Sequence, residues 1–453
     1  MTKYTAIFLG SALCLGLLIK CSDATQDMKG GNTDMTAKNA RLIATHNPPT
    51  GWQKHTVVRA GGSSEPLRLP AMFNLVSAPY GHENMQMPSL VYMPEKKRLL
   101  MTAEFGVTTS IKTIVMTSDD FGGMWTPRRW MHTDAKGNPD IGGTVGVTYL
   151  GNGVLTASPE SGRRVFSRDY GETWNESYPI PDGANGRVLY HWDPVVVDRD
   201  KSGNIVRMLE SRWNETGYGR NDPNHKYSQA YLWTSEDVGK TWSKEIPIPQ
   251  WYGVNEVALV RAKNGDLIAG CRTDNPVRFT DIQDMFSGLG ISISKDNGKS
   301  WSPINQLYEY GRHHASFVVL PNGHVVMVYI VRAGYTDSKD GFTQYGVEAV
   351  ISKDNGKSWD LDHKYILAWW TGQVKGPNWW WGLPQSSATV LLPDGSLLTT
   401  FCIGFRNEAS QPLCIMDTAL IKWRLSDKPV DRTRKIRNAP FDSELRNKYN
   451  PEQ

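Results

Sequence analysis

One eight-residue motif occurs five times along the chain and restricts the folds that it can adopt. Two copies, "SKDNGKSW", are identical and begin at Ser294 and Ser352. Related copies are "SDDFGGMW" from Ser118, "SRDYGETW" from Ser167 and "SEDVGKTW" from Ser235. The copies recur at intervals of roughly 50 to 70 residues, a period that fits β-propeller blades better than helical solenoids.

The residue types of the motif indicate a structural role. Serine and aspartate side chains can accept hydrogen bonds from backbone N–H groups of a turn, and glycine can adopt a positive φ. The final tryptophan can fill the space beneath the turn. We therefore expect the motif to shape turns rather than to carry out chemistry.

Six apolar hairpins accompany the five motifs. Each has two apolar strands around a turn, such as the Asn-Gly of "EVALVRAKNGDLIAGCR" and the Asp-Gly of "SATVLLPDGSLLTTF". This pattern predicts an all-β fold, a six-bladed β-propeller of four-stranded antiparallel sheets over residues 51–426. The N-terminal stretch "HTVVRA" is a candidate to complete the last sheet.

The octet resembles the Asp box of the sialidase (neuraminidase) superfamily, whose members contain BNR repeats, and the resemblance runs from about Met72 to Leu425. The segment "NEVALVRAKNGDLIAGCRTD" resembles the sialidase stretch that carries the glutamate partner of the nucleophile and one carboxylate-binding arginine. That likeness implies these two roles for Glu256 and Arg272. An arginine fork can grip a carboxylate through two hydrogen bonds.

Three sialidase signatures are missing, so the chain looks divergent. Gln86-Met87-Pro88 stands where sialidases have Arg-Ile-Pro, and Gln385-Ser386-Ser387-Ala388 replaces the stretch with the tyrosine nucleophile. No segment after Glu104 resembles the aspartate acid loop. The fold that the resemblance implies is unaffected, whereas the substrate stays open.

Equal spacing from the hairpin turns brings charged residues into one register. Seven residues after the first four turns stand Glu104, Glu160, Glu210 and Arg272, at the ends of otherwise apolar strands, and Ile330 and Cys402 hold this position in the last two hairpins. Burying unpaired charges costs several kcal/mol each. Either a wet central cavity or a structural network of ion pairs would explain the pattern.

The register and the starts of the innermost strands supply the candidate site residues. The catalytic candidates are Glu256, Glu210, Asp193 and Glu104. The substrate-binding candidates are Arg272, Arg312, His313, His314, Arg332, Gln385, Trp380 and Trp381. The chain has no CxxC pair and no HExxH motif, so we expect no metal site and no cofactor.

These residues predict an exported, sialidase-like exo-glycosidase that removes a terminal sugar, such as an acidic one, from a glycan. Most glycosidases use two carboxyl groups, and this ring offers several. One alternative is a hydrolase or polysaccharide lyase for a uronate, arabinose or rhamnose unit, in which His313 or His314 would be the base. Another is a glycan-binding propeller without catalytic activity.

The N-terminus predicts export. Lys3 precedes an apolar run from Ala6 to Ile19, which is typical of a signal peptide. "LIKC" resembles a bacterial lipobox, so residues 1–21 are expected to be a lipoprotein-type signal with lipidation at Cys21. The periplasm or outer-membrane surface of a Gram-negative bacterium is the expected location.

The remaining segments are expected to lie outside the propeller. Residues 22–50 are polar and aperiodic and read as a tether, and residues 427–453 as a basic tail. The chain has 50 Lys and Arg against 46 Asp and Glu. This near balance argues against a nucleic-acid partner and against membrane contact other than through the lipid.

Overall fold

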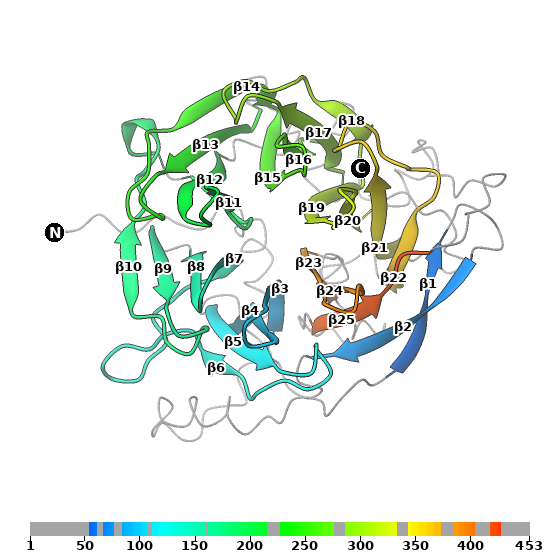
Figure 1. The fold of residues 1–453 in the computed structure, drawn as a ribbon, viewed down its shortest axis with the longest axis horizontal. Coiled ribbons are helices and arrows are strands. Elements are labelled where there is room, and N and C mark those ends of the chain that lie inside the picture. Colours follow the sequence, from blue (N-terminus) through cyan, green and yellow to red (C-terminus); the bar gives the residue numbers. More distant parts are fainter. Residues whose placement is uncertain are drawn as a thin grey trace, which may run out of the picture.

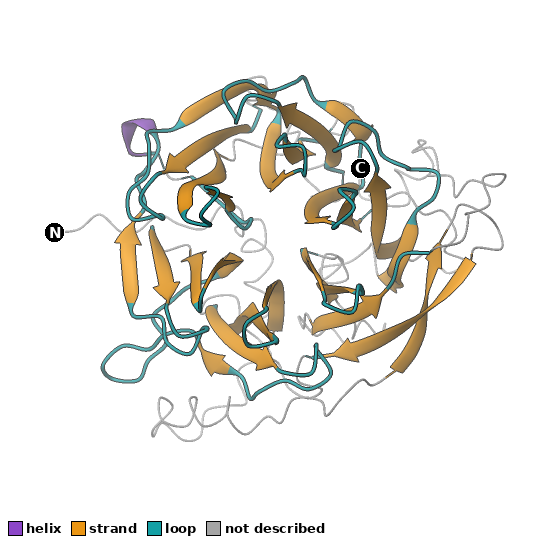
Figure 2. Cartoon of the chain, in the orientation of Figure 1, coloured by secondary structure: helices purple, strands orange, loops and turns teal. Residues whose placement is uncertain are grey.

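The computed structural model describes residues 54–60, 67–76, 84–106, 111–159, 162–187, 189–214, 227–275, 286–332, 343–372, 385–403 and 417–426. Their strands form sheets arranged radially around a central axis (Figures 1 and 2). The predicted all-β, six-bladed propeller of four-stranded antiparallel sheets is confirmed. Within these ranges no helix has the length and apolar character needed to cross a membrane.

Blades 1 to 3 are consecutive four-stranded meanders. Blade 1 contains β3 (Asn84–Met93), β4 (Arg98–Gly106), β5 (Lys112–Ser118) and β6 (Arg129–Trp130). Blade 2 contains β7 (Thr144–Gly151), β8 (Val154–Pro159), β9 (Arg163–Ser167) and β10 (Glu176–Pro179), and the short 3-10 turn η2 (Ala184–Gly186) follows it. Blade 3 contains β11 (Val196–Arg199), β12 (Ile205–Asn214), β13 (Gln229–Ser235) and β14 (Ile246–Tyr252).

Blades 4 and 5 repeat this plan, and blade 6 takes one strand from the N-terminal part of the chain. Blade 4 contains β15 (Val254–Arg261), β16 (Leu267–Thr273), β17 (Gly288–Ser294) and β18 (Asn305–Tyr308). Blade 5 contains β19 (Arg312–Val319), β20 (Val325–Val331), β21 (Thr343–Ser352) and β22 (Tyr365–Gly372). Blade 6 contains β23 (Ser387–Leu391), β24 (Leu397–Ile403), β25 (Asp417–Trp423) and β2 (Leu67–Leu75).

The ring is closed by β2 and not by the predicted "HTVVRA" stretch. Strand β2 pairs antiparallel with β25, with Met72 opposite Lys422. "HTVVRA" lies in β1 (Lys54–Ala60), which pairs with β2 and with β22 of blade 5. The prediction chose the strand next to the correct one. It overlooked β2, the strand that follows "HTVVRA", whose Ala71 and Phe73 belong to the same hydrophobic core as residues of β25. Blades 5 and 6 and β1 thereby form one nine-stranded sheet.

The repeated octets form turns between the third and fourth strands of five blades. In the fourth copy, Ser294 Oγ accepts a hydrogen bond from Gly298 N at 2.7 Å, and Asp296 accepts one from Ser300 N at 2.9 Å. In the fifth copy, Gly356 has a φ of +85°, and a Cβ there would lie 2.6 Å from a methyl carbon of Ile268. Glycine is therefore needed both for the turn and for packing against the neighbouring blade.

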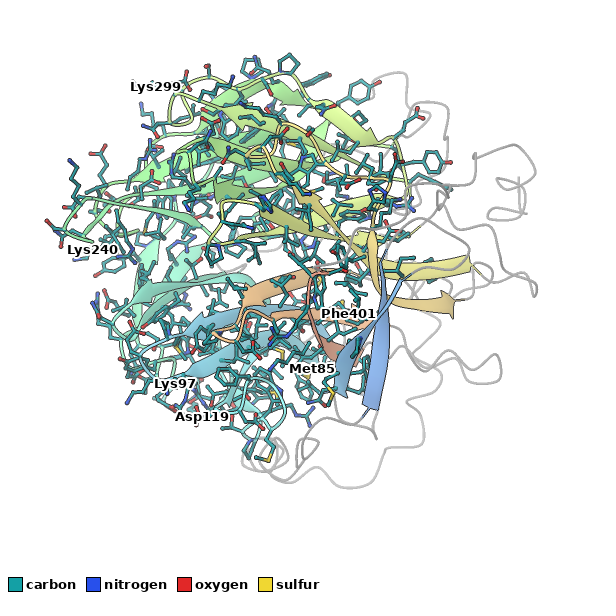
Figure 3. All side chains as sticks on the ribbon, turned by 45° about the vertical axis from the view of Figure 1, so that its right-hand side comes forward. Met85, Lys97, Asp119, Lys240, Lys299 and Phe401 are labelled. Carbon is teal, nitrogen blue, oxygen red and sulfur yellow. The ribbon has the colours of Figure 1, made fainter. Side chains whose placement is uncertain are left out.

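Side chains between neighbouring blades form the core. Leu209 of blade 3 packs with Cys271 of blade 4, and Val328 of blade 5 packs with Phe401 of blade 6. Figure 3 shows Phe401 and Met85 inside the molecule, whereas Lys97, Asp119, Lys240 and Lys299 lie along its left border. These four residues belong to turns of blades 1, 3 and 4. Burying one large apolar side chain contributes about 1.5–3 kcal/mol, so the repeated contacts hold the blades in a ring.

Candidate active site

The innermost strands surround the axis (Figure 1), and several are irregular where they begin. Register shifts interrupt β3 between Gln86 and Ser89, β15 between Val254 and Val257, and β19 between His313 and Ser316. A β-bulge turns side chains in new directions and is common next to active sites. This end of the ring therefore presents side chains that regular strands would point elsewhere.

Glu256 and Arg272 form an ion pair at this end of blade 4. Arg272 Nη1 donates a hydrogen bond to Glu256 Oε1 at 2.6 Å, from the neighbouring strand. Burial acts to raise the pKa of Glu256, but the charge of Arg272, with smaller effects of His314 and Arg332, brings it below its ordinary value. Glu256 is thus an ionised carboxylate in a largely enclosed place.

Asp193 precedes β11, and its pKa is shifted in the opposite direction to that of Glu256. Burial and the negative charge of Glu256 raise the pKa of Asp193 well above its ordinary value. Its loop is held close to blade 2, because a Cβ on Gly146 would lie 2.5 Å from the carbonyl carbon of Asp193. A protonated carboxyl coupled to an ionised one is the pattern by which paired acids and bases can be recognised.

His313 and His314 lie in the bulge of β19. His313 is fully buried and His314 is 6% exposed. Among the described residues, no hydrogen-bond partner contacts any ring nitrogen of either side chain. Burial and the positive charges of Arg272 and Arg332 lower the pKa of both residues, although Glu256 opposes this at His314. Both imidazoles are therefore neutral near pH 7.

Arg332 and Gln385 connect blades 5 and 6 at the same end. Arg332 directly follows β20, and its Nη2 donates a hydrogen bond to Gln385 Oε1 at 2.8 Å. The charge of Arg332 acts on both Glu256 and His314. The structure thus brings seven of the predicted site residues into one connected group: Asp193, Glu256, Arg272, His313, His314, Arg332 and Gln385.

Glu210 instead lies in a network of ion pairs between blades 2 and 3. It pairs with Arg164 of β9 and accepts a hydrogen bond from Arg212 Nε at 3.1 Å. All three side chains are at least 98% buried. Burial opposes ionisation, but the two arginines lower the pKa of Glu210 to about 2. Both arginines bind this carboxylate. Of the two explanations for the register of charges, a structural network of ion pairs therefore fits Glu210 better than a wet central cavity.

Arg312 has a comparable place between blades 4 and 5. Its Nε donates to Glu348 Oε2 at 3.1 Å, and its guanidinium group lies 4.8 Å from the ring centre of Tyr308. Sequence reasoning did not identify Glu348 or Arg164 as partners. Glu348 is the single charged residue in the apolar strand "YGVEAVI". That pattern could have identified it as a buried charge that needs a partner.

Glu104 faces the first strand of its own blade and the entry to blade 2. It accepts a hydrogen bond from Gln86 Nε2 at 3.1 Å, and a Cβ on Gly143 would overlap its carboxylate. The other predicted residues, Glu160, Trp380, Trp381 and Cys21, lie outside the described residues. Within the described ranges, no group of three His, Cys, Asp or Glu side chains is placed to hold a metal ion.

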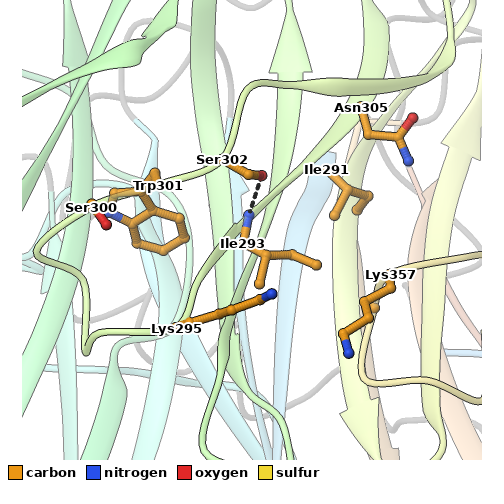
Figure 4. Close-up of a pocket in the computed structure, with 9 residues that line it drawn as sticks. Ile291, Ile293, Lys295, Ser300, Trp301, Ser302, Asn305 and Lys357 are labelled. Carbon is orange, nitrogen blue, oxygen red and sulfur yellow. Dashed lines mark hydrogen bonds between the residues drawn. The ribbon is translucent and has the colours of Figure 1, made fainter.

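A separate pocket of about 470 Å³ lies between β17 and the octet turn of blade 5 (Figure 4). Its lining includes Trp301, Lys295 and Lys357, and Ile293 N donates to Ser302 Oγ at 3.0 Å beside it. Among the described residues, no acidic side chain or histidine lines this pocket. Its described lining therefore offers no pair of carboxyl groups of the kind that most glycosidases use.

Comparisons with known proteins agree with this architecture. Residues 138–360 match the model of the BNR repeat-like domain family. A Bacteroides fragilis protein named Sialidase is 26% identical over 215 residues, which are 43% of this chain and 36% of that protein. The chain is therefore similar to a sialidase over part of its length, within the region that matches the BNR repeat-like domain. Its BNR-type propeller nevertheless spans only about a third of the length of that relative.

Two solved structures share this propeller fold. A protein of unknown function from Dyadobacter fermentans aligns with a TM-score of 0.56 and 15% identity, over 82% of this chain and 99% of that one. A Hadza microbial sialidase aligns with a TM-score of 0.50 and 14% identity, over 75% of this chain and 65% of that one. At this identity the likeness concerns the fold alone.

The site itself differs from the sialidase pattern at two positions. Gln86 stands where that pattern has its first arginine, and Met87 after it has a φ of 50° in the bulge of β3. Gln385 stands where the tyrosine nucleophile is expected, and it is bonded to Arg332. The propeller fold is present, while these two groups of the standard sialidase site are replaced.

Proposed function

We propose that this propeller is a glycoside hydrolase whose reaction takes place between Asp193 and Glu256. The proposal is carried by the different environments of two coupled carboxyl groups: burial and the charge of Glu256 raise the pKa of Asp193, whereas the charge of Arg272 lowers the pKa of Glu256. Glycoside hydrolysis commonly needs such a pair, with one carboxylic acid and one carboxylate on either side of the scissile bond.

In this proposal each group has a defined step. Asp193 donates its proton to the glycosidic oxygen as the bond between that oxygen and the anomeric carbon breaks. Glu256 either attacks the anomeric carbon or removes a proton from an attacking water molecule, and the separation of the two groups in the complex decides which. Arg272 keeps Glu256 ionised and oriented through the 2.6 Å hydrogen bond.

We propose a terminal, acidic sugar as the substrate. Arg272 and Arg332 supply two positive charges beside Glu256, and arginine is well suited to bind a carboxylate. The relative from Bacteroides fragilis is named a sialidase, which supports an acidic substrate for the shared region. The replaced arginine and tyrosine positions favour a sugar other than the standard one.

A uronate lyase is a second candidate, because two neutral imidazoles adjoin the same arginines. In that reaction His313 or His314 would remove the proton from C5 of a uronate. The electron pair would form the C4–C5 double bond and expel the substituent at C4. The arginines would neutralise the carboxylate.

The experiment that tests these proposals is release of sugar from a panel of glycans and synthetic glycosides. The wild type is compared with Glu256→Gln, and folding of both proteins is checked by thermal unfolding. Hydrolysis requires a free reducing sugar without new ultraviolet absorbance, and Glu256→Gln should lower the rate by about 10²–10⁴. An unsaturated uronate product would overturn hydrolysis, and binding without any product would favour a glycan-binding propeller.

We also propose export with lipidation at Cys21, supported by the sequence of residues 1–21. Cells fed a clickable palmitate analogue should label the wild type in the membrane fraction. Cys21→Ala should lose the label. An unlabelled wild-type protein would contradict the lipid anchor.

A further inference from the structure

His314 has an unusual backbone and an unusual lack of partners. Its φ of 55° lies in the left-handed region, which is uncommon for residues other than glycine, although Asn, Asp and His adopt it more often than the rest. Such conformations persist where the surrounding fold enforces them, and they cluster at functional sites. In β19 the bulge between His313 and Ser316 enforces this one, and β19 lies against β15, the strand of blade 4 that carries Glu256.

The ring nitrogens of His314 should be able to bind a ligand. Neither nitrogen has a hydrogen-bond partner in the described structure, although only 6% of the residue is exposed. Buried polar groups in folded proteins are normally hydrogen-bonded, since leaving them unpaired is costly. His313 is unpaired too but has no exposed surface, whereas His314 keeps 6% exposure.

The chemistry of the neighbours restricts the ligand group. The charges of Glu256, Arg272 and Arg332 all act on the imidazole, and the two arginines disfavour its cationic form. A neutral imidazole donates from one nitrogen and accepts at the other. A sugar hydroxyl can do both, whereas a carboxylate would bind at the arginines.

We propose that His314 determines substrate specificity by hydrogen bonding to one hydroxyl group of the sugar bound beside Glu256. This inference rests on the proposed glycan site, but not on hydrolysis. It selects sugars by the presence of a hydroxyl at one ring position, in addition to any acidic group.

The test uses binding rather than turnover. Wild-type protein with ¹⁵N-labelled histidine rings is titrated with D-glucuronate, D-galacturonate, N-acetylneuraminate, L-rhamnose and L-arabinose. The His314 signals are assigned from His314→Asn, since asparagine tolerates the left-handed backbone. One sugar should shift the His314 ring nitrogens saturably. His314→Asn should weaken its binding about tenfold, as expected for one hydrogen bond.

Two comparisons make the result specific. His324→Asn changes a histidine in the turn at the opposite end of β19 and should leave binding unchanged. For one monodeoxy analogue of the bound sugar, wild type and His314→Asn should bind alike. If no sugar shifts the His314 signals, or if His314→Asn binds as tightly as wild type, the inference is overturned. Shifts without sugar release would overturn the proposed hydrolysis and leave the role of His314 intact.

Discussion

Glu256 Oε1 accepts a hydrogen bond from Arg272 Nη1 at 2.6 Å, across the two innermost strands of blade 4. This contact keeps Glu256 ionised despite its burial. The resulting negative charge also acts on Asp193 and raises the pKa of that carboxyl. One ion pair therefore establishes the difference between the two carboxyl groups on which the proposed mechanism depends.

Asp193→Asn should remove the general acid. Hydrolysis of glycosides with poor leaving groups should fall by about 10²–10⁴, whereas activated aryl glycosides should lose less because their leaving group needs no proton. Wild-type kcat/KM should fall at high pH, where Asp193 loses its proton, and the variant should lack this limb. Equal losses for all leaving groups in steady-state assays would rule out this role.

Glu210→Gln should destabilise the fold without acting on the reaction directly. Removing one partner of a buried ion pair costs about 3–5 kcal/mol, because Arg164 and Arg212 stay buried. Urea unfolding at pH 7 measures this loss. The matched control is Glu176→Gln, which breaks a more exposed pair with Arg168 and should cost less than about 1 kcal/mol.

The contribution of Glu210 should also depend on pH. Its pKa falls from the ordinary 4.5 to about 2 in the folded protein. The folded state therefore binds fewer protons than the unfolded state in this range. The stabilisation is present above pH 4.5 and is lost as the pH falls toward 2. A stability difference between wild type and Glu210→Gln that stays constant over this range would contradict the ion-pair account.

Gly356→Ala should show that the octet stabilises the fold. The substitution places a Cβ 2.6 Å from Ile268 at a φ of +85°, so strain and overpacking should together cost about 2–4 kcal/mol. Gly265→Ala is the matched control, since its φ is +94° but no atom lies within 4 Å of the added Cβ. In urea unfolding, the free energy of unfolding of Gly356→Ala should be well below that of Gly265→Ala. Equal stabilities would refute the packing role.

Removal of β2 should open the ring. A chain beginning at residue 67 keeps the strand that pairs with β25, and a chain beginning at residue 77 loses it together with Asn74. Asn74 Nδ2 donates to Gly122 O of blade 1 at 2.9 Å. The shorter chain should expose the edge of β25 and aggregate or unfold at lower temperature. Similar thermal unfolding of both chains would show that closure does not need β2.

Much of the fold follows from the sequence because its signals are local. The octet forms its turn with hydrogen bonds between residues two and four positions apart, as between Asp296 and Ser300. The strand that closes the ring was assigned wrongly, since β25 and β2 are far apart in the sequence and pair only in the folded ring. The signals for blades and turns are written within each repeat, and the closure is not.

For the candidate site, too, the sequence predicted some features and the folded ring decided others. The sequence by itself determined the blades, the turns and the register that carries Glu104, Glu210 and Arg272, because strand periodicity needs only neighbouring residues. Only the tertiary structure decided that Glu210 faces Arg164, 46 positions away, while Arg272 reaches Glu256. It also placed His314 beside Glu256, through a bulge in β19. Which face a charged side chain occupies depends on bulges and on the neighbouring blade, and those contacts exist only after the ring has formed.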